Sequence, residues 1–105
     1  LHDMGDPVGV ANHIKNVLSD EGTFMLVEPA AADNMEDNLN TIGGLAYGFS
    51  TIVCVPTSRA QDVGLCLGAQ AGRISLTGVL ISAGFNHVRE SARTGTNMVF
   101  EVKQA

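Results

Sequence analysis

The residues of this chain that are suited to chemistry are three histidines, two cysteines and eleven acidic residues, and most of them follow no known functional spacing. Cys54 and Cys66 form neither a CxxC pair nor a disulfide framework. Both lie in apolar segments with a helical pattern, so we expect buried thiols. His13 and His87 share no ligand spacing with the cysteines or the acids, which argues against a zinc site. A hydrolase is not favoured, because the sequence has no nucleophile elbow and no Cys/His pairing.

Two glycine-rich segments resemble nucleotide-binding loops in composition only. Gly43-Gly44 falls within a helical pattern, and the segment 68–72 follows no predicted strand. A phosphate-binding loop of the dinucleotide type follows a strand and opens a helix. We therefore expect neither segment to bind a nucleotide or a phosphate.

The composition predicts one small folded domain without a nucleic-acid or membrane partner. The chain has 105 residues, 45% hydrophobic and 16% charged, which is too apolar for disorder. No apolar run approaches the roughly 20 residues of a membrane span. Six Lys and Arg residues against eleven acids, a net charge of -5, argue against nucleic-acid binding by charge. No signal-peptide pattern is seen, so we expect a cytoplasmic protein.

The first part of the chain is expected to form a helix and then a strand. Asp6-Pro7 is a typical helix start, with a carboxylate N-cap and proline at the first helical position, and an apolar stripe follows over residues 10–18. Residues 24–27 are apolar without alternation, which is typical of strands covered on both faces. Glu28 and the proline after it should end this strand.

Helices are predicted in the middle of the chain. Residues 39–53 show helical periodicity, and Pro56 should break this helix. A further helix is expected from residue 57 or 58 to about Ala69, although its glycines make it weak. Leu76–Ala83 predicts another helix, closed by Gly84.

The C-terminal segment predicts a β-hairpin. Residues 87–91 suit a strand, residues 93–96 a turn, and residues 98–103 alternate between apolar and other side chains. The order helix, strand, helices, strand, strand places the chain in the α/β class.

Three segments resemble motifs of class I S-adenosylmethionine-dependent methyltransferases, in the same order. Residues 1–6, Leu-His-Asp-Met-Gly-Asp, resemble the L-H-D-W-x-D motif that follows the fourth strand of O-methyltransferases. Residues 22–29 look like their fifth strand, and residues 82–85, Ser-Ala-Gly-Phe, resemble their A-G-F ending before a terminal hairpin. The whole chain looks most similar to bacterial members with H-D-M-G-D-P.

This resemblance implies the C-terminal part of a Rossmann-like methyltransferase fold. About three strands are expected, one of the parallel type plus a terminal antiparallel hairpin, with three to four helices. The family binds S-adenosylmethionine through its first strands, and no such pattern is present here. The chain begins at Leu1, in what reads as a loop, so we expect residues 1–105 to be a fragment that neither binds the cofactor nor acts alone.

The resemblance also assigns candidate catalytic residues. His2 occupies the place of the general base that takes a proton from the acceptor hydroxyl, although it could instead only shape the pocket. Glu28 matches a carboxylate that orients this histidine, or it caps nearby backbone N–H groups. Asp3 could bind the acceptor, whereas Asp6 reads as the helix cap. Met4 stands where plant-type members have an aromatic residue, so the acceptor atom remains open between O, N and C.

A pocket and a partner follow from the same resemblance. Residues 38–55 correspond to the helix that lines the acceptor pocket, where Asn40, Tyr47 and Phe49 could contact a small-molecule substrate or simply belong to the core. Without the preceding strand of the complete sheet, strand 24–28 would have an open edge, which favours pairing with another chain. We therefore expect a homodimer or higher oligomer through this edge. The alternative to the methyltransferase is a non-enzymatic α/β self-association or interaction module.

Overall fold

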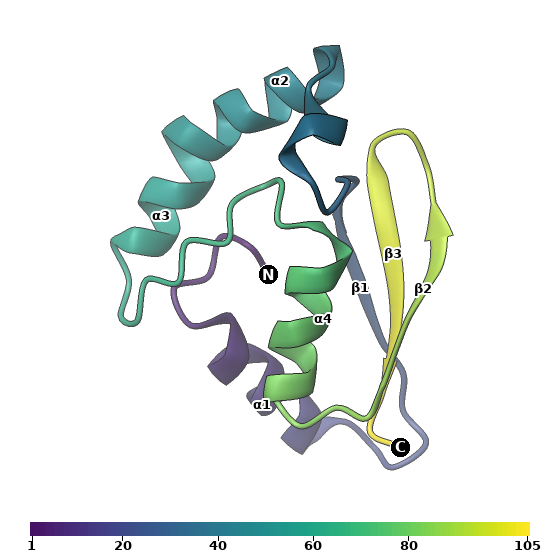
Figure 1. Ribbon diagram of the computed structural model, residues 1–105. Helices are drawn as coiled ribbons and strands as arrows, with labels where there is room; N and C mark the ends of the chain where they lie inside the picture. The colour runs from purple at the N-terminus through teal and green to yellow at the C-terminus, as the bar shows by residue number, and fades with distance from the viewer.

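A three-stranded antiparallel sheet forms one layer of the molecule in the computed structural model, which describes residues 1–105 (Figure 1). Its strands are β1 (Phe24–Pro29), β2 (His87–Arg93) and β3 (Asn97–Lys103), in the order β1-β3-β2. Both pairings are antiparallel, so the last strand of the chain lies between the other two. The α/β class and the terminal hairpin predicted from the sequence are confirmed.

Two helices, α1 (Pro7–Val17) and α4 (Gly72–Ser82), form the second layer and lie side by side against one face of the sheet (Figure 1). The core lies between these layers, because the inward side chains of β1 and β3 share one face and meet the apolar stripes of the helices. Its buried members come from all four elements and from the turn after α4: Ala11, Leu26, Leu76, Leu80, Ala83, Phe85, Met98, Phe100 and Val102.

The signals that begin and end these helices act as the sequence predicts. The Asp6 side chain accepts a hydrogen bond of 2.9 Å from the backbone N–H of Gly9, which otherwise has no partner in the first turn of α1. Helix α4 ends at Ser82, and Gly84 has a φ of 96°, the left-handed conformation that glycine adopts without strain.

The middle helix continues through Pro56, so the predicted break is wrong. Helix α2 (Thr41–Phe49) passes through a π-helical turn (Ser50–Cys54) directly into α3 (Val55–Arg59). The π turn widens the helix just before the proline, and this accommodates a residue that has no N–H to donate. None of the helices combines the length and the apolar character needed to cross a bilayer.

The helix predicted to reach Ala69 is also wrong, because α3 ends at Arg59 and a loop runs from there to α4. Two serines of the middle helix hold this loop: Ser58 Oγ accepts from the N–H of Cys66 at 3.0 Å, and Ser50 Oγ accepts from that of Ala69 at 3.1 Å. Cys66 therefore lies in a loop with a φ of 58°, half-buried, and not in a helix as expected. The two serine hydroxyls thus accept hydrogen bonds from backbone N–H groups that would have bonded to carbonyl oxygens if the segment had formed a helix.

Strand β1 is covered on one face only, in contrast to the expectation from its unbroken apolar run. Leu26 and Glu28 point into the core, whereas Met25 and Val27 on the other face are 68% and 48% exposed. Helices α1 and α4 lie on the inner side, so the outer face of this strand has no cover within residues 1–105 (Figure 1). The β1 edge that is not paired with β3 is free as well.

Candidate functional site

A histidine and a glutamate that are distant in sequence form a close pair near the end of β1. The imidazole Nδ1 of His2 lies 2.5 Å from Glu28 Oε2, and the backbone N–H of His2 donates to Glu28 Oε1 at 3.3 Å. The terminal amino group of Leu1 lies 2.8 Å from the same Oε1. The Glu28 side chain is only 2% exposed and that of His2 15% exposed. The two oxygens of this buried carboxylate are therefore paired with the imidazole and with the backbone N–H of His2.

Glu28 is buried because of its position in the strand. It alternates with Leu26 on the inner face of β1 and lies opposite Met98 of β3. An inward side chain near the strand's carboxyl end reaches the rim of the core, where a polar partner from a loop can meet it. His2 is that partner.

The loop that carries His2 is fixed by the end of α3. Gln61 accepts from the N–H of Gly5 at 2.9 Å and donates to the carbonyl oxygen of Asp3 at 3.1 Å. Ser58 Oγ donates to the carbonyl oxygen of Met4 at 2.9 Å. These side chains hold the backbone of the three residues that follow His2, so the imidazole is positioned by the end of α3 and the turn after it, and not by the opening loop alone.

Gly5 is required by this close approach. A Cβ atom at this position would lie 2.5 Å from Gln61 Cβ and 2.6 Å from the carbonyl oxygen of Asp62. We expect Gly5→Ala to destabilise the chain by about 1–3 kcal/mol through overpacking. Gly78→Ala, in α4 with nothing within 4 Å, should instead stabilise it by up to about 1 kcal/mol. Urea unfolding of both variants checks this, and equal midpoints would contradict it.

The two members of the pair shift each other's pKa. The hydrogen bond to Glu28 raises the pKa of His2 above its ordinary 6.5, although burial acts in the opposite direction. Burial acts to raise the pKa of Glu28, but His2 and the terminal amine outweigh it and hold this pKa below the ordinary 4.5. Between pH 4.5 and 6.5 both members of the pair are therefore charged in the folded state.

A pH dependence of stability follows from these shifts. The contribution of Glu28 is present above pH 4.5 and is lost as the pH falls through its lowered pKa; that of His2 is present below pH 6.5 and is lost as the pH rises through its raised pKa. We expect the unfolding free energy of wild type to be about 1.5–3 kcal/mol higher than that of Glu28→Gln. This difference should be largest between pH 4.5 and 6.5. Urea titrations across pH measure this difference, and a difference that does not vary with pH would contradict it.

Asp3 and Cys54 complete a small cluster on the other side of the imidazole. His2 Nε2 lies 3.1 Å from Asp3 Oδ1. Asp3 Oδ1 is covered from solvent and has no well-aligned hydrogen bond, so its polar neighbours are the His2 ring and the Cys54 thiol. Cys54, at the end of the π turn, is 7% exposed, and the donor atoms of His2, Asp3 and Cys54 all lie within 4.8 Å of one another. Burial, and after it the Asp3 carboxylate, raise the pKa of the Cys54 thiol.

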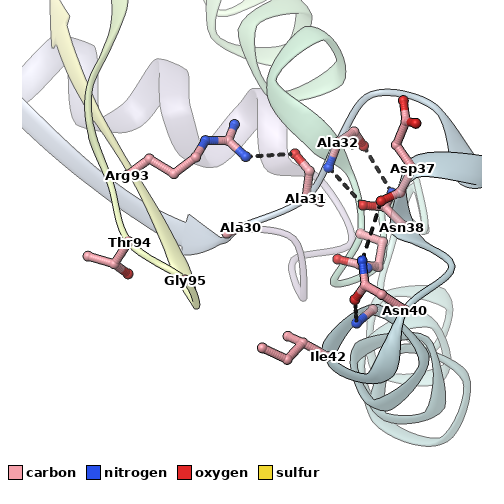
Figure 2. A pocket seen from close by; sticks show the side chains of 12 residues that line it. Ala30, Ala31, Ala32, Asp37, Asn38, Asn40, Ile42, Arg93, Thr94 and Gly95 are labelled. Carbon is pink, nitrogen blue, oxygen red and sulfur yellow. Dashed lines mark hydrogen bonds between the residues drawn. The ribbon is translucent and has the colours of Figure 1, made fainter.

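A separate polar pocket of about 410 Å³ lies just beyond the carboxyl end of β1 (Figure 2). Its wall is formed by the segment after β1, by the start of α2 and by the β2–β3 turn. Arg93 donates to the carbonyl oxygen of Ala31 at 3.3 Å and pairs with Glu90 at 2.6 Å, while Asn38 holds the backbone of Ala32 on both sides. The pocket does not include His2 or Glu28, so this polar hollow and the acid–base pair are different places.

The sequence-predicted substrate residues are divided among these places. Asp3 lies in the His2 cluster, and Asn40 lines the polar pocket, where its side chain also caps α2 by accepting from the N–H of Gly43 at 2.8 Å. Tyr47 is half-buried, with its hydroxyl 3.4 Å from Asn38 Nδ2. Phe49 is 53% exposed and borders a shallow apolar hollow on α2. Within residues 1–105 they do not line one common pocket.

The arrangement can orient an imidazole, keep its Nδ1 bonded to a carboxylate, and direct Nε2 towards a second carboxylate and a thiol. Such a ring can take a proton or bind a metal ion at Nε2. No protein-family model and no curated protein matches the sequence of this chain.

Proposed function

We propose that this chain is the acceptor-substrate half of a cytoplasmic class I S-adenosylmethionine-dependent methyltransferase that acts on a small molecule, and that it is inactive without a cofactor-binding half. The observation that supports this most is the bond between His2 Nδ1 and Glu28 Oε2. The three methyltransferase-like motifs require a histidine in the opening loop and a carboxylate at the end of the following strand. A chance similarity of sequence gives no reason for these two residues to meet.

The chemistry proposed for the pair is proton removal from the methyl acceptor. S-adenosylmethionine supplies the electrophilic methyl group when it is bound by the other half. When the methyl group is transferred, the proton of the acceptor would pass to Nε2 of His2, whose imidazole is free to take it once the pH exceeds its raised pKa. Glu28, bonded to Nδ1, holds the ring in one orientation and stabilises the imidazolium that results. Asp3 beside Nε2 is placed to contact the acceptor.

A labelled-methyl assay tests this proposal. The reading frame upstream of Leu1 is expected to encode a strand followed by an acidic glycine-rich loop. The longer product should transfer the methyl group of S-adenosylmethionine to members of a panel of small hydroxylated, amino and carbon acceptors. An upstream sequence without such a loop, together with no transfer to any acceptor, would contradict the proposal.

Self-association is the second candidate, supported by the free edge of β1 and the exposed Met25 and Val27 on its outer face. An apolar edge strand without a partner favours pairing with another chain. Light scattering at increasing concentration of residues 1–105 should then show a dimer or larger species. A monodisperse monomer at high concentration would count against this candidate and leave the methyltransferase proposal unaffected.

A further inference from the structure

The cluster of His2, Asp3 and Cys54 joins residues that the sequence gives no reason to connect. The opening loop supplies an imidazole nitrogen and a carboxylate oxygen, and the π turn of the middle helix supplies a thiol. The three donor atoms lie within 4.8 Å of one another. In a tetrahedral zinc site, ligand atoms at metal distances of about 2.0–2.3 Å lie roughly 3.3–3.7 Å apart. Small rotations of the three side chains, each moving its donor atom by less than a bond length towards the centre of the cluster, would give this spacing.

The polar atoms of the cluster are poorly satisfied by the protein alone. Asp3 Oδ1 is covered from solvent and accepts no hydrogen bond. The Cys54 thiol is more than nine-tenths buried, forms no disulfide, and has the Asp3 carboxylate as a polar neighbour. Two carboxylates, Asp3 and Glu28, lie next to one imidazole, so a cation bound at Nε2 in place of a proton would lie beside opposite charge.

We propose that His2 Nε2, Asp3 and the Cys54 thiolate bind one divalent transition-metal ion, with zinc as the best fit. A nitrogen, an oxygen and a sulfur ligand are the donors that Zn²⁺ and Co²⁺ accept, and three protein ligands leave one coordination position open. Glu28 would act in the outer shell, because it accepts a hydrogen bond from the Nδ1–H of the ligating ring and so fixes Nε2 as the nitrogen that faces the metal. The half-exposed Asp3 side chain leaves an entry path from solvent.

This inference goes beyond the proposed methyl transfer and does not depend on it. The metal and a proton compete for the same nitrogen, His2 Nε2. The imidazole alone would act as base only in the metal-free chain.

Cobalt titration of the chain tests the site directly. The chain, freed of metal with a chelator and kept reduced, should bind one Co²⁺ with a near-ultraviolet thiolate-to-cobalt charge-transfer band, and Zn²⁺ should displace it. Cys54→Ser should remove the band and weaken zinc binding by more than about 100-fold, whereas Glu28→Gln should weaken it by about 10–100-fold. Cys66→Ser is the matched control, since Cys66 lies in the loop after α3 and outside the cluster; it should retain the band.

Circular dichroism of each variant separates lost ligands from lost folding. If Cys54→Ser does not fold, His2→Asn supplies the same test and should also lose zinc affinity by more than about 100-fold. A chain that gives no thiolate-to-cobalt band would overturn the proposal. So would a band that survives Cys54→Ser or His2→Asn, or one that Cys66→Ser abolishes. Because the titration contains no S-adenosylmethionine and no acceptor, its failure leaves the methyltransferase proposal standing, and failure of methyl transfer leaves the metal site standing.

Discussion

Replacing Phe100 by alanine is expected to lower the unfolding free energy by about 3–5 kcal/mol, the usual cost of emptying a core phenylalanine site. Phe100 is 0% exposed and lies in β3, the central strand, opposite Leu26 of β1. The cavity would open in the middle of the only core, between the sheet and the helices. A domain of this size has only about 5–15 kcal/mol of stability, so the variant should be partly or wholly unfolded.

Phe49→Ala is the matched control for this prediction. Phe49 is 53% exposed on α2, so its truncation should change the unfolding free energy by no more than about 0.5 kcal/mol. Urea unfolding followed by circular dichroism measures both variants. A Phe100→Ala chain with the wild-type midpoint would show that the core lies elsewhere.

If the proposed methyltransferase is correct, replacing His2 by alanine in the longer product is expected to lower the rate constant of methyl transfer by about 10²–10⁴-fold, the usual contribution of a general acid–base group. The loss follows because Nε2 is the atom proposed to receive the acceptor proton, and no other imidazole lies in the cluster. Glu28→Gln should give a smaller loss, since it leaves the ring in place but removes the charge that stabilises the imidazolium.

His13→Ala is the control for this second prediction, since His13 lies exposed on α1 and should retain the wild-type rate. Steady-state kinetics with labelled S-adenosylmethionine separates the rate constant from acceptor binding. Equal rates for wild type and His2→Ala at all pH values would remove the proposed role of the imidazole and leave it a structural partner of Glu28.

Local signals in the sequence were sufficient to predict α1, β1, α4 and the terminal hairpin. Asp6, Gly84 and the alternation of residues 98–103 act within a few residues of themselves, so their consequences are readable without a structure. The path after Pro56 was not readable in this way. It depends on a π turn and on serine hydroxyls that hold the loop after α3, and these interactions form only after the chain has turned back.

The candidate site was also predictable from the sequence only in part. Glu28 was expected to flank His2 because of the motif order, and the structure brings the two together. The place of Cys54 beside them was missed, because it results from the way Gln61 and Ser58 draw the opening loop onto the end of the middle helix. No residue spacing in the sequence predicts the contact between Cys54 and the opening loop.

Calorimetric titration with S-adenosylmethionine most directly tests the proposal that residues 1–105 hold the acceptor site and not the cofactor site. We predict saturable binding by the longer product that includes the upstream half, and no measurable heat of binding by residues 1–105 alone. Tight binding of S-adenosylmethionine to residues 1–105 alone would contradict the account, because it would place the cofactor site on the half to which we assign the acceptor.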